Sequence, residues 1–304
     1  MSIDPNIANH AGTPAAEVDI SDDLVRALLQ AQCPNLAALP LQMVEAGWDN
    51  IMFRLGDKLA VRLPRRTLGD GNIINEQTWL PQLARFLPAH IPVPTFAGTP
   101  GEGYPWHWSI VPWIEGEPAD LAPLNSGQGE VLADFLNALH ELAPEDAPHN
   151  PYRGIPLSDR AEGIEERMAR LAQETDLITN PIAAIWQQAL SVPIDVPKTW
   201  LHGDLHQRNV LADGNGKITG IIDWGDICAG DRACDLASVW TLLPDADARA
   251  DMMEHYEASP ETWQRAAGWA VMYGVKLADA GRTDGSHMEA MGIAILDRLN
   301  ADAG

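Results

Sequence analysis

The stretch TWLHGDLHQRNVLADGNGKITGIIDWGD, residues 199–226, decides the fold of this chain. An apolar run at 199–201 leads into a polar loop, and two further apolar runs at 210–212 and 218–222 enclose a Gly-Asn-Gly turn. Two short strands joined by such a turn predict a β-hairpin. The hairpin would hold Asp204, Asn209 and Asp223 at one end of a small sheet.

Phosphoryl transfer needs the side chains that these three positions supply. Asp204 is suited to orient an attacking hydroxyl and accept its proton, while the oxygens of Asn209 and Asp223 suit Mg²⁺ bound to nucleotide phosphates. Protein kinases place their catalytic Asp and their metal-binding Asn at the same i, i+5 spacing. We therefore expect Asp204 to be the catalytic residue and Asn209 and Asp223 to be the metal ligands.

The same stretch resembles the aminoglycoside phosphotransferase family. That pattern reads approximately His-Gly-Asp-Leu-His-x-x-Asn-Val-Leu, then Ile-Asp-Trp, then Gly-Asp-Pro-x-x-Asp-Leu-Ala, and this chain has HGDLHQRNVL, IIDW and GDRACDLA. The one departure is Arg232 at the usual proline. The resemblance implies an α+β, bilobal protein-kinase-like fold, Mg²⁺ as a cofactor, and ATP or GTP as the phosphate donor.

A metal-dependent hydrolase is the competing interpretation of the loop, because His202, Asp204 and His206 alternate as metal ligands do in some hydrolases. Such a site needs further His or carboxylate clusters, and the other histidines form no recurring ligand motif. This interpretation also leaves Asn209 and Asp223 without a role. A plainer alternative is that both histidines are structural and that the Asp-rich loop is an ordinary turn.

The pattern along the chain predicts two lobes after a flexible leader at residues 1–19. A nucleotide-binding lobe at 20–112 has the element order of a kinase small lobe, with a helix capped by Ser21, then strands within 42–63, a helix at 76–87, and strands at 92–95 and 108–111. A hinge at 112–116 leads to a catalytic and acceptor-binding lobe at 113–304. Its late helices are expected at 231–243, 245–257, 260–280 and 286–301.

The resemblance also implies the nucleotide-binding residues of the small lobe. Arg62 takes the position of the phosphate-binding strand lysine, and Glu76 is its acidic partner, although a surface arginine and a helix-start acid are the plainer interpretations. Gly47 and Asn50 bound the loop that would cover the nucleotide, or form an ordinary hairpin turn. At the hinge, the carbonyl of Pro112 would accept from the nucleotide base and the N–H of Ile114 would donate to it, while Trp113 packs.

Composition limits the partners. With 43 acidic and 20 basic residues, the formal net charge of −23 argues against nucleic acid and anionic membranes, which are polyanions. An acidic surface attracts cations, or simply keeps the protein soluble. Three unpaired cysteines, a polar N-terminus without a signal-peptide pattern and the absence of a long apolar run predict a cytoplasmic protein.

The resulting expectation is a small-molecule kinase. It would move the γ-phosphate of a nucleotide to a hydroxyl of an aminoglycoside or related antibiotic, or else of choline, homoserine or a sugar. A non-catalytic nucleotide-binding or scaffold protein is the alternative of another class. Acidic positions in the second lobe favour a cationic acceptor, and they are Glu162, Glu165, Glu166, Asp251, Glu254, Glu257, Asp279 and Asp284.

Three further groups in this lobe are assigned roles. Asp235 resembles an aspartate that braces the catalytic loop, and Asp226 is a candidate for metal or water binding. Tyr273, with Trp263 and Trp269, is a candidate lining residue for the acceptor pocket.

Overall fold

A computed structural model describes residues 15–47, 49–285 and 287–303. The chain divides into two compact units, one formed by Met1–Arg85 with Ile91–Ile114 and the other by Phe86–His90 with Glu115–Gly304. Most of the predicted leader lies outside the described residues. The segment around Glu17 is anchored to Thr67, because the Glu17 carboxylate accepts hydrogen bonds from the backbone N–H and the hydroxyl of Thr67.

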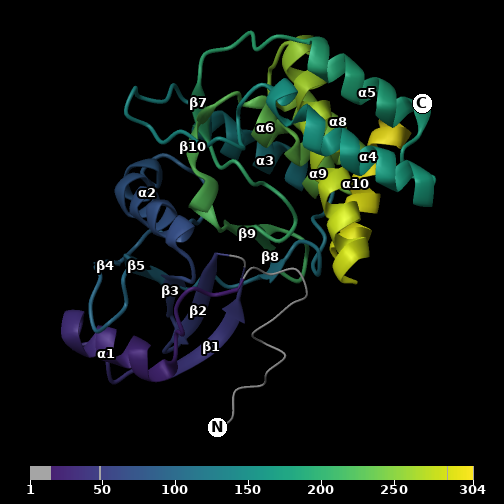
Figure 1. Ribbon diagram of the computed structural model, residues 1–304. Coiled ribbons are helices and arrows are strands. Elements are labelled where there is room, and N and C mark those ends of the chain that lie inside the picture. The colour runs from purple at the N-terminus through teal and green to yellow at the C-terminus, as the bar shows by residue number, and fades with distance from the viewer. Residues whose placement is uncertain (1–14, 48, 286, 304) are drawn as a thin grey trace. The chain divides into compact units, whose positions relative to one another are not determined.

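The first unit is built on a five-stranded antiparallel sheet (Figure 1) with the strand order β1-β2-β3-β5-β4. Two helices, α1 (Asp22–Gln32) and α2 (Thr67–Leu83), accompany it. The Ser21 hydroxyl caps α1 by accepting from the N–H of Leu24, as its sequence predicts. The strands are β1 (Leu41–Ala46), β2 (Asn50–Leu55), β3 (Leu59–Pro64), β4 (Phe96–Gly98) and β5 (Trp108–Pro112).

Alternation of burial along β2 explains how this sheet forms its core. Ile51, Phe53 and Leu55 are buried at every second position, and they pack with Leu28 and Leu29 of α1. Two expectations were wrong here. Helix α2 begins nine residues before Glu76, and the strand expected at 92–95 lies instead at 96–98, since prolines at 92 and 94 lack the N–H that a strand ladder needs.

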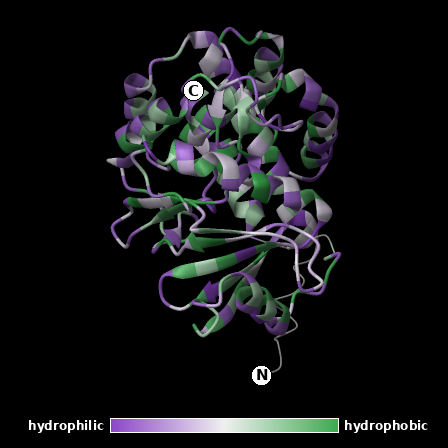
Figure 2. Ribbon diagram, turned by 90° about the vertical axis from the view of Figure 1, so that its left-hand side faces the viewer, coloured by the Kyte–Doolittle hydropathy of each residue, from purple (hydrophilic) through white to green (hydrophobic). Residues whose placement is uncertain are grey.

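The second unit is mostly helical, and α9 (Pro260–Asp284) is its central element. Helices α4, α5, α6, α7 and α10 all pack against α9. Helix α9 is coloured yellow-green in Figure 1. The helices of this unit in Figure 2 carry both hydrophobic and hydrophilic segments, as expected for helices that are buried on one side. The other helices are α3 (Gln128–Leu139), α4 (Ala161–Glu174), α5 (Asn180–Ser191), α6 (Ala233–Leu236), α7 (Ser238–Leu242), α8 (Ala246–His255) and α10 (Met288–Ala303), with short 3-10 turns η1 (Leu157–Arg160) and η2 (Trp224–Asp226).

Short strands flank the polar loop that contains Asp204. β8 (Val210–Ala212) and β9 (Ile218–Ile221) form the predicted antiparallel hairpin, and β6 (Glu117–Pro118) extends it. β7 (Thr199–Leu201) pairs instead with β10 (Cys228–Gly230). A single helix was expected at 231–243. The structure has two short helices there, α6 and α7, and they follow β10. No helix of the described residues is long and apolar enough to cross a membrane.

Candidate active site

The loop between β7 and β8 carries Asp204 and is fixed by a buried carboxylate. Asp235 in α6 is fully buried, and its two oxygens accept hydrogen bonds from the backbone N–H of His202 at 2.7 Å and of Gly203 at 2.8 Å. Buried N–H groups cost free energy when they are unpaired, so this carboxylate determines the path of the loop. The expectation that Asp235 braces the loop is confirmed.

Gly203 is required by the same turn. Its φ is +85°, and a Cβ there would lie 2.7 Å from the carbonyl oxygen of Asp226. The hydroxyl of Tyr273 on α9 donates to the Gly203 carbonyl at 2.7 Å, and the hydroxyl of Thr241 on α7 donates to the Leu205 carbonyl at 2.7 Å. Two helices thus fix the backbone on both sides of Asp204.

Asp204 and Asn209 lie together as their spacing predicts. The side-chain amide of Asn209 donates to the backbone carbonyl of Asp204 at 2.9 Å and lies 3.4 Å from Oδ2 of the same residue. The Asp204 side chain keeps 22% of its surface exposed, so a hydroxyl can reach it. This geometry suits a carboxylate that orients and deprotonates an acceptor.

Arg153 is the site residue that sequence reasoning missed. Its Nη2 donates to Oδ1 of Asp204 at 2.5 Å, and its Nε donates to Oδ2 of Asp226 at 2.9 Å. Asn150 also donates to Asp226, at 2.8 Å. Asp226 therefore anchors Arg153, and a role for it in metal or water binding stays a prediction. Arg153 lies 51 positions before Asp204 in a segment without a motif, so no local pattern indicates it.

The charges around Asp204 keep it ionised. Burial alone would raise its pKa, but Arg153, then His206 and Lys276, hold the pKa of Asp204 well below its ordinary value. The Nε2 atom of His206 lies 3.3 Å from Oδ2. Asp204 is therefore a carboxylate at neutral pH, as an acceptor of a proton must be.

Asp223 follows β9 and lies beside Asn209 in the fold. The N–H of Ile222 donates to the Asn209 carbonyl at 2.9 Å, so the two candidate ligands sit on bonded neighbouring segments. Asp223 has φ +59° and ψ +69°, a left-handed conformation that is uncommon outside glycine and is found at functional positions. One amide oxygen and one exposed carboxylate form an all-oxygen donor set, which fits Mg²⁺ completed by phosphate oxygens and water.

His202 has a structural role. Its Nδ1 accepts from the N–H of Asp204 at 3.2 Å, its Nε2 contacts the Ile222 carbonyl at 2.9 Å, and its ring packs on Trp224. Both ring nitrogens are thus engaged. Within the part of the chain that the structure describes, no group of three or more His, Cys, Asp or Glu side chains is arranged to hold a metal, so the hydrolase interpretation has no ligand set.

In the first unit, Arg62 and Glu76 form the predicted pair. Nη1 of Arg62 lies 2.5 Å from Oε2 of Glu76, with 5% and 0% of the two side chains exposed. Arg62 is therefore not a surface arginine. Glu76 lies well inside α2 and does not cap its start. A buried pair of this kind positions the guanidinium on β3, and its role toward phosphate stays a prediction.

The turn and hinge residues are also located in this unit. Gly47 donates to the Asn50 carbonyl at 2.8 Å, which closes the turn between β1 and β2, and Arg65 donates to the Gly47 carbonyl. Pro112 ends β5 and Ile114 follows two residues later. Between them, the N–H of Trp113 donates to the Lys58 carbonyl and its ring lies under the guanidinium of Arg54, 4.1 Å from the ring centre.

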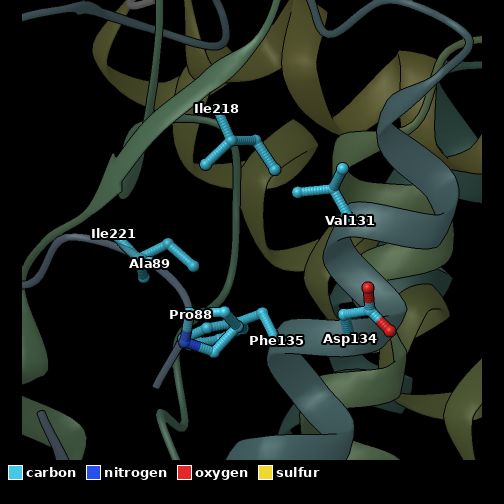
Figure 3. Close-up of a pocket in the computed structure, with 7 residues that line it drawn as sticks. All are labelled: Pro88, Ala89, Val131, Asp134, Phe135, Ile218 and Ile221. Carbon is cyan, nitrogen blue, oxygen red and sulfur yellow. The ribbon is translucent and has the colours of Figure 1, made fainter. Parts of the chain in front are cut away.

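A small pocket of about 90 Å³ lies elsewhere in the second unit. Figure 3 shows Pro88 and Ala89 opposite Val131 and Phe135 of α3. Its one acidic lining residue, Asp134, pairs with His255 at 2.8 Å. The pocket contains none of the predicted site residues.

Comparisons with known proteins agree with this geometry. A model of the phosphotransferase enzyme family matches residues 41–269. Aminoglycoside 3'-phosphotransferase of Escherichia coli is 27% identical over 186 residues, which cover 58% of this chain and 66% of that protein. Homoserine kinase of Pseudomonas aeruginosa is 29% identical over 178 residues, which cover 52% of this chain and 55% of that protein. The chain thus spans between half and two thirds of the length of these relatives.

The fold has solved counterparts. The GDP complex of wild-type aminoglycoside 2'-phosphotransferase-IIIa matches with a TM-score of 0.67 at 17% identity, over 93% of this chain and 99% of that chain. The predicted protein-kinase-like α+β fold is confirmed by this likeness. Because the family model covers most of the sequence, the chain belongs to the phosphotransferase enzyme family.

Proposed function

We propose that this protein transfers the γ-phosphate of ATP or GTP to a hydroxyl of a small molecule, with Mg²⁺ as a cofactor. The observation that carries the proposal is the Asp204 carboxylate, ionised and partly exposed, with the amide of Asn209 at its Oδ2 atom. Family membership and two relatives named as kinases of small hydroxyl compounds support it.

The roles of the residues follow from their contacts. Asp204 would orient the acceptor hydroxyl and take its proton, while Arg153 and Asp235 keep that carboxylate ionised and in place. Asn209 and Asp223 would hold Mg²⁺, which neutralises charge on the nucleotide phosphates. Arg62, fixed by Glu76, would bind phosphate oxygens with the planar fork of its guanidinium.

The remaining predicted positions would act on the nucleotide. Backbone groups of the turn from Gly47 to Asn50 would lie over its phosphates, and the Pro112 carbonyl and the Ile114 N–H would pair with its base. Structures of related phosphotransferases include complexes with GDP and with ADP, so both ATP and GTP are candidates for the donor.

Two classes of acceptor remain in the proposal. Relatives named for aminoglycosides favour an antibiotic, which is a cationic alcohol. A relative named homoserine kinase favours a metabolic alcohol, and one structural observation favours it too: the groups that face Asp204 are Arg153, His206 and Lys276, which are basic.

The test is Asp204→Asn in a nucleotide-turnover assay with a panel of hydroxyl compounds. Loss of the general base should lower kcat roughly 100-fold or more while leaving magnesium-nucleotide binding intact. Asp176→Asn, at an exposed loop position, is the control and should behave as wild type. Nucleotide binding without turnover for any acceptor would favour the scaffold alternative, and near-normal kcat in Asp204→Asn would refute the assignment of the base.

A further inference from the structure

Three cationic side chains, Arg153, Lys276 and Arg160, interact with one another near Asp204. Arg153 contacts its Oδ1 atom, and Lys276 interacts electrostatically with Asp204, Asp226, Arg153 and Arg160. Arg160 in turn interacts electrostatically with Arg153 and with the phenol group of Tyr273. The whole chain has only 20 Lys and Arg residues against 43 acids, so three of them beside two carboxylates, Asp204 and Asp226, is a local reversal of its charge.

Helix α9 directs Lys276 toward this place. Tyr273 and Lys276 are three positions apart, which puts them on the same face of the helix. That face meets the catalytic loop, because the Tyr273 hydroxyl donates to the carbonyl of Gly203, the residue before Asp204. The Arg153 guanidinium lies over the Tyr273 ring, 5.5 Å from its centre.

Two of the three cations form no ion pair at contact distance with the residues that the structure describes. Arg153 is paired with Asp204 and Asp226, whereas neither Lys276 nor Arg160 has a salt bridge to a residue within 15–47, 49–285 and 287–303. The Nε of Arg160 is buried and has no hydrogen-bond partner there, and its guanidinium lies over the exposed ring of Tyr152. Lys276 reaches solvent but is crowded by protein atoms, and this partial desolvation, together with Arg153, lowers its pKa.

Two of the acids expected to attract a cation bind other side chains of the protein. Asp279 is buried and pairs with Arg167 and Arg170 on α4. Glu165 accepts from the side chains of Trp186 and Gln187 on α5. An acceptor approaching Asp204 from this side therefore meets unpaired positive charge.

We propose that Lys276 and Arg160 form an anion-binding subsite for the acceptor, so that the substrate is a small alcohol that also carries a carboxylate or phosphate group. The inference rests on the proposed phosphotransfer to a hydroxyl and deepens it. A charge-assisted hydrogen bond from either cation would hold the anionic group while the hydroxyl of the same molecule lies against Asp204.

The transferring nucleotide phosphate is the other anion that these cations could serve. The two oxygens of Asp204 distinguish the directions. Asn209, the candidate metal ligand, lies at Oδ2, while Arg153 donates to Oδ1. Arg153 thus contacts the oxygen that Asn209 does not approach, and Lys276 and Arg160 both interact electrostatically with Arg153, which favours the acceptor.

The experiment compares acceptors with and without one anionic group: glycerate with glyceramide, L-homoserine with L-homoserine amide, and ribose 5-phosphate with ribose, with kanamycin as a cationic acceptor. Binding is measured by calorimetry and KM by nucleotide turnover, for wild type, Lys276→Met and Arg160→Met. Arg282→Met is the control, because it removes one positive charge from the same helix at an exposed pair with Glu289.

Wild type should prefer the anionic member of at least one pair by about 10-fold or more in Kd or KM, and either variant should reduce that preference to a few-fold. Arg282→Met should keep it. The glycerate and homoserine pairs distinguish a carboxylate from the phosphate of ribose 5-phosphate. Equal binding within every pair, or tightest binding of kanamycin, would overturn the subsite. Equal loss of turnover for both members of a pair would instead assign the cations to the nucleotide phosphates and would also overturn it.

The two proposals fail separately. Absence of turnover with every acceptor refutes the proposed function, whereas the binding preference still decides the subsite because it needs no chemistry. Turnover without a charge preference refutes the subsite and leaves the phosphotransferase assignment in place.

Discussion

Replacing Asp235 with asparagine tests how the catalytic loop is held. In the wild type, one carboxylate oxygen accepts from the N–H of His202 and the other from the N–H of Gly203, at 2.7 and 2.8 Å in a fully buried position. An asparagine keeps one oxygen and presents an NH₂ group to the second N–H. The NH₂ group and that backbone N–H are both donors, so the charge-assisted hydrogen bond to that N–H is lost. Water cannot replace it, because the position is fully buried.

The expected loss follows from that geometry. An orphaned buried N–H costs about 1–3 kcal/mol, and the surviving bond loses its ionic partner, so we expect the free energy of unfolding to fall by about 2–4 kcal/mol. For a unit of this size, that loss corresponds to a decrease in Tm of roughly 5–15 °C. Catalysis should also weaken at temperatures where the variant is folded, because the loop that carries Asp204 loses its support.

Urea unfolding and calorimetry measure the change in stability, and nucleotide turnover at 15 °C measures the effect on the loop. Asp176→Asn, which is exposed, should change stability by no more than about 0.5 kcal/mol. If the free energies of unfolding of Asp235→Asn and of that control differ by less than about 0.5 kcal/mol, the buried carboxylate does not brace the loop and the reasoning is wrong.

Three further predictions concern metal, packing and pH. Asp223→Ala should abolish magnesium-dependent nucleotide binding, and Asn209→Ala should weaken it less because an amide carries no charge. Calorimetric titration of the nucleotide with and without magnesium measures both effects. Unchanged binding by Asp223→Ala would contradict the metal site. Gly98→Ala should lower Tm and cost about 1–3 kcal/mol or more, since the added Cβ would lie 2.2 Å from the ring of Trp108, and a Tm equal to wild type would show that the strand can shift. Because its pKa is lowered in the fold, ionised Asp204 contributes stability above its unfolded pKa of about 4, and that contribution disappears as pH falls through the folded pKa. Wild type should therefore lose more stability than Asp204→Asn between about pH 5 and pH 2 in urea unfolding, and equal losses would argue against the pKa shift.

The chemistry of the hairpin could be predicted from the sequence because its geometry is local. The turn at 214–216 and the flanking apolar runs determine the pairing of β8 with β9, and the i, i+5 spacing alone brings Asn209 to Asp204. Element boundaries were less predictable where tertiary contacts decide them. The pattern predicts one helix at 231–243, whereas the structure has two short helices, α6 and α7, directly after β10, which pairs with β7.

The sequence by itself determined the class of protein and the nearness of Asn209 to Asp204, because a short spacing encodes them, and the resemblance to a known family implied the Arg62–Glu76 pair. Tertiary structure alone decided the environment of Asp204. Arg153, Arg160 and Lys276 come from a loop, a 3-10 turn and the middle of α9, and they meet only because α9 packs against the catalytic loop through Tyr273. Composition predicts an acidic protein that attracts cations, whereas folding concentrates its few positive charges at the reactive carboxylate. The physical reason is that net charge sums over the whole surface, while recognition at a site depends on the few groups that packing places within a Debye length of it, about 10 Å at 0.1 M salt.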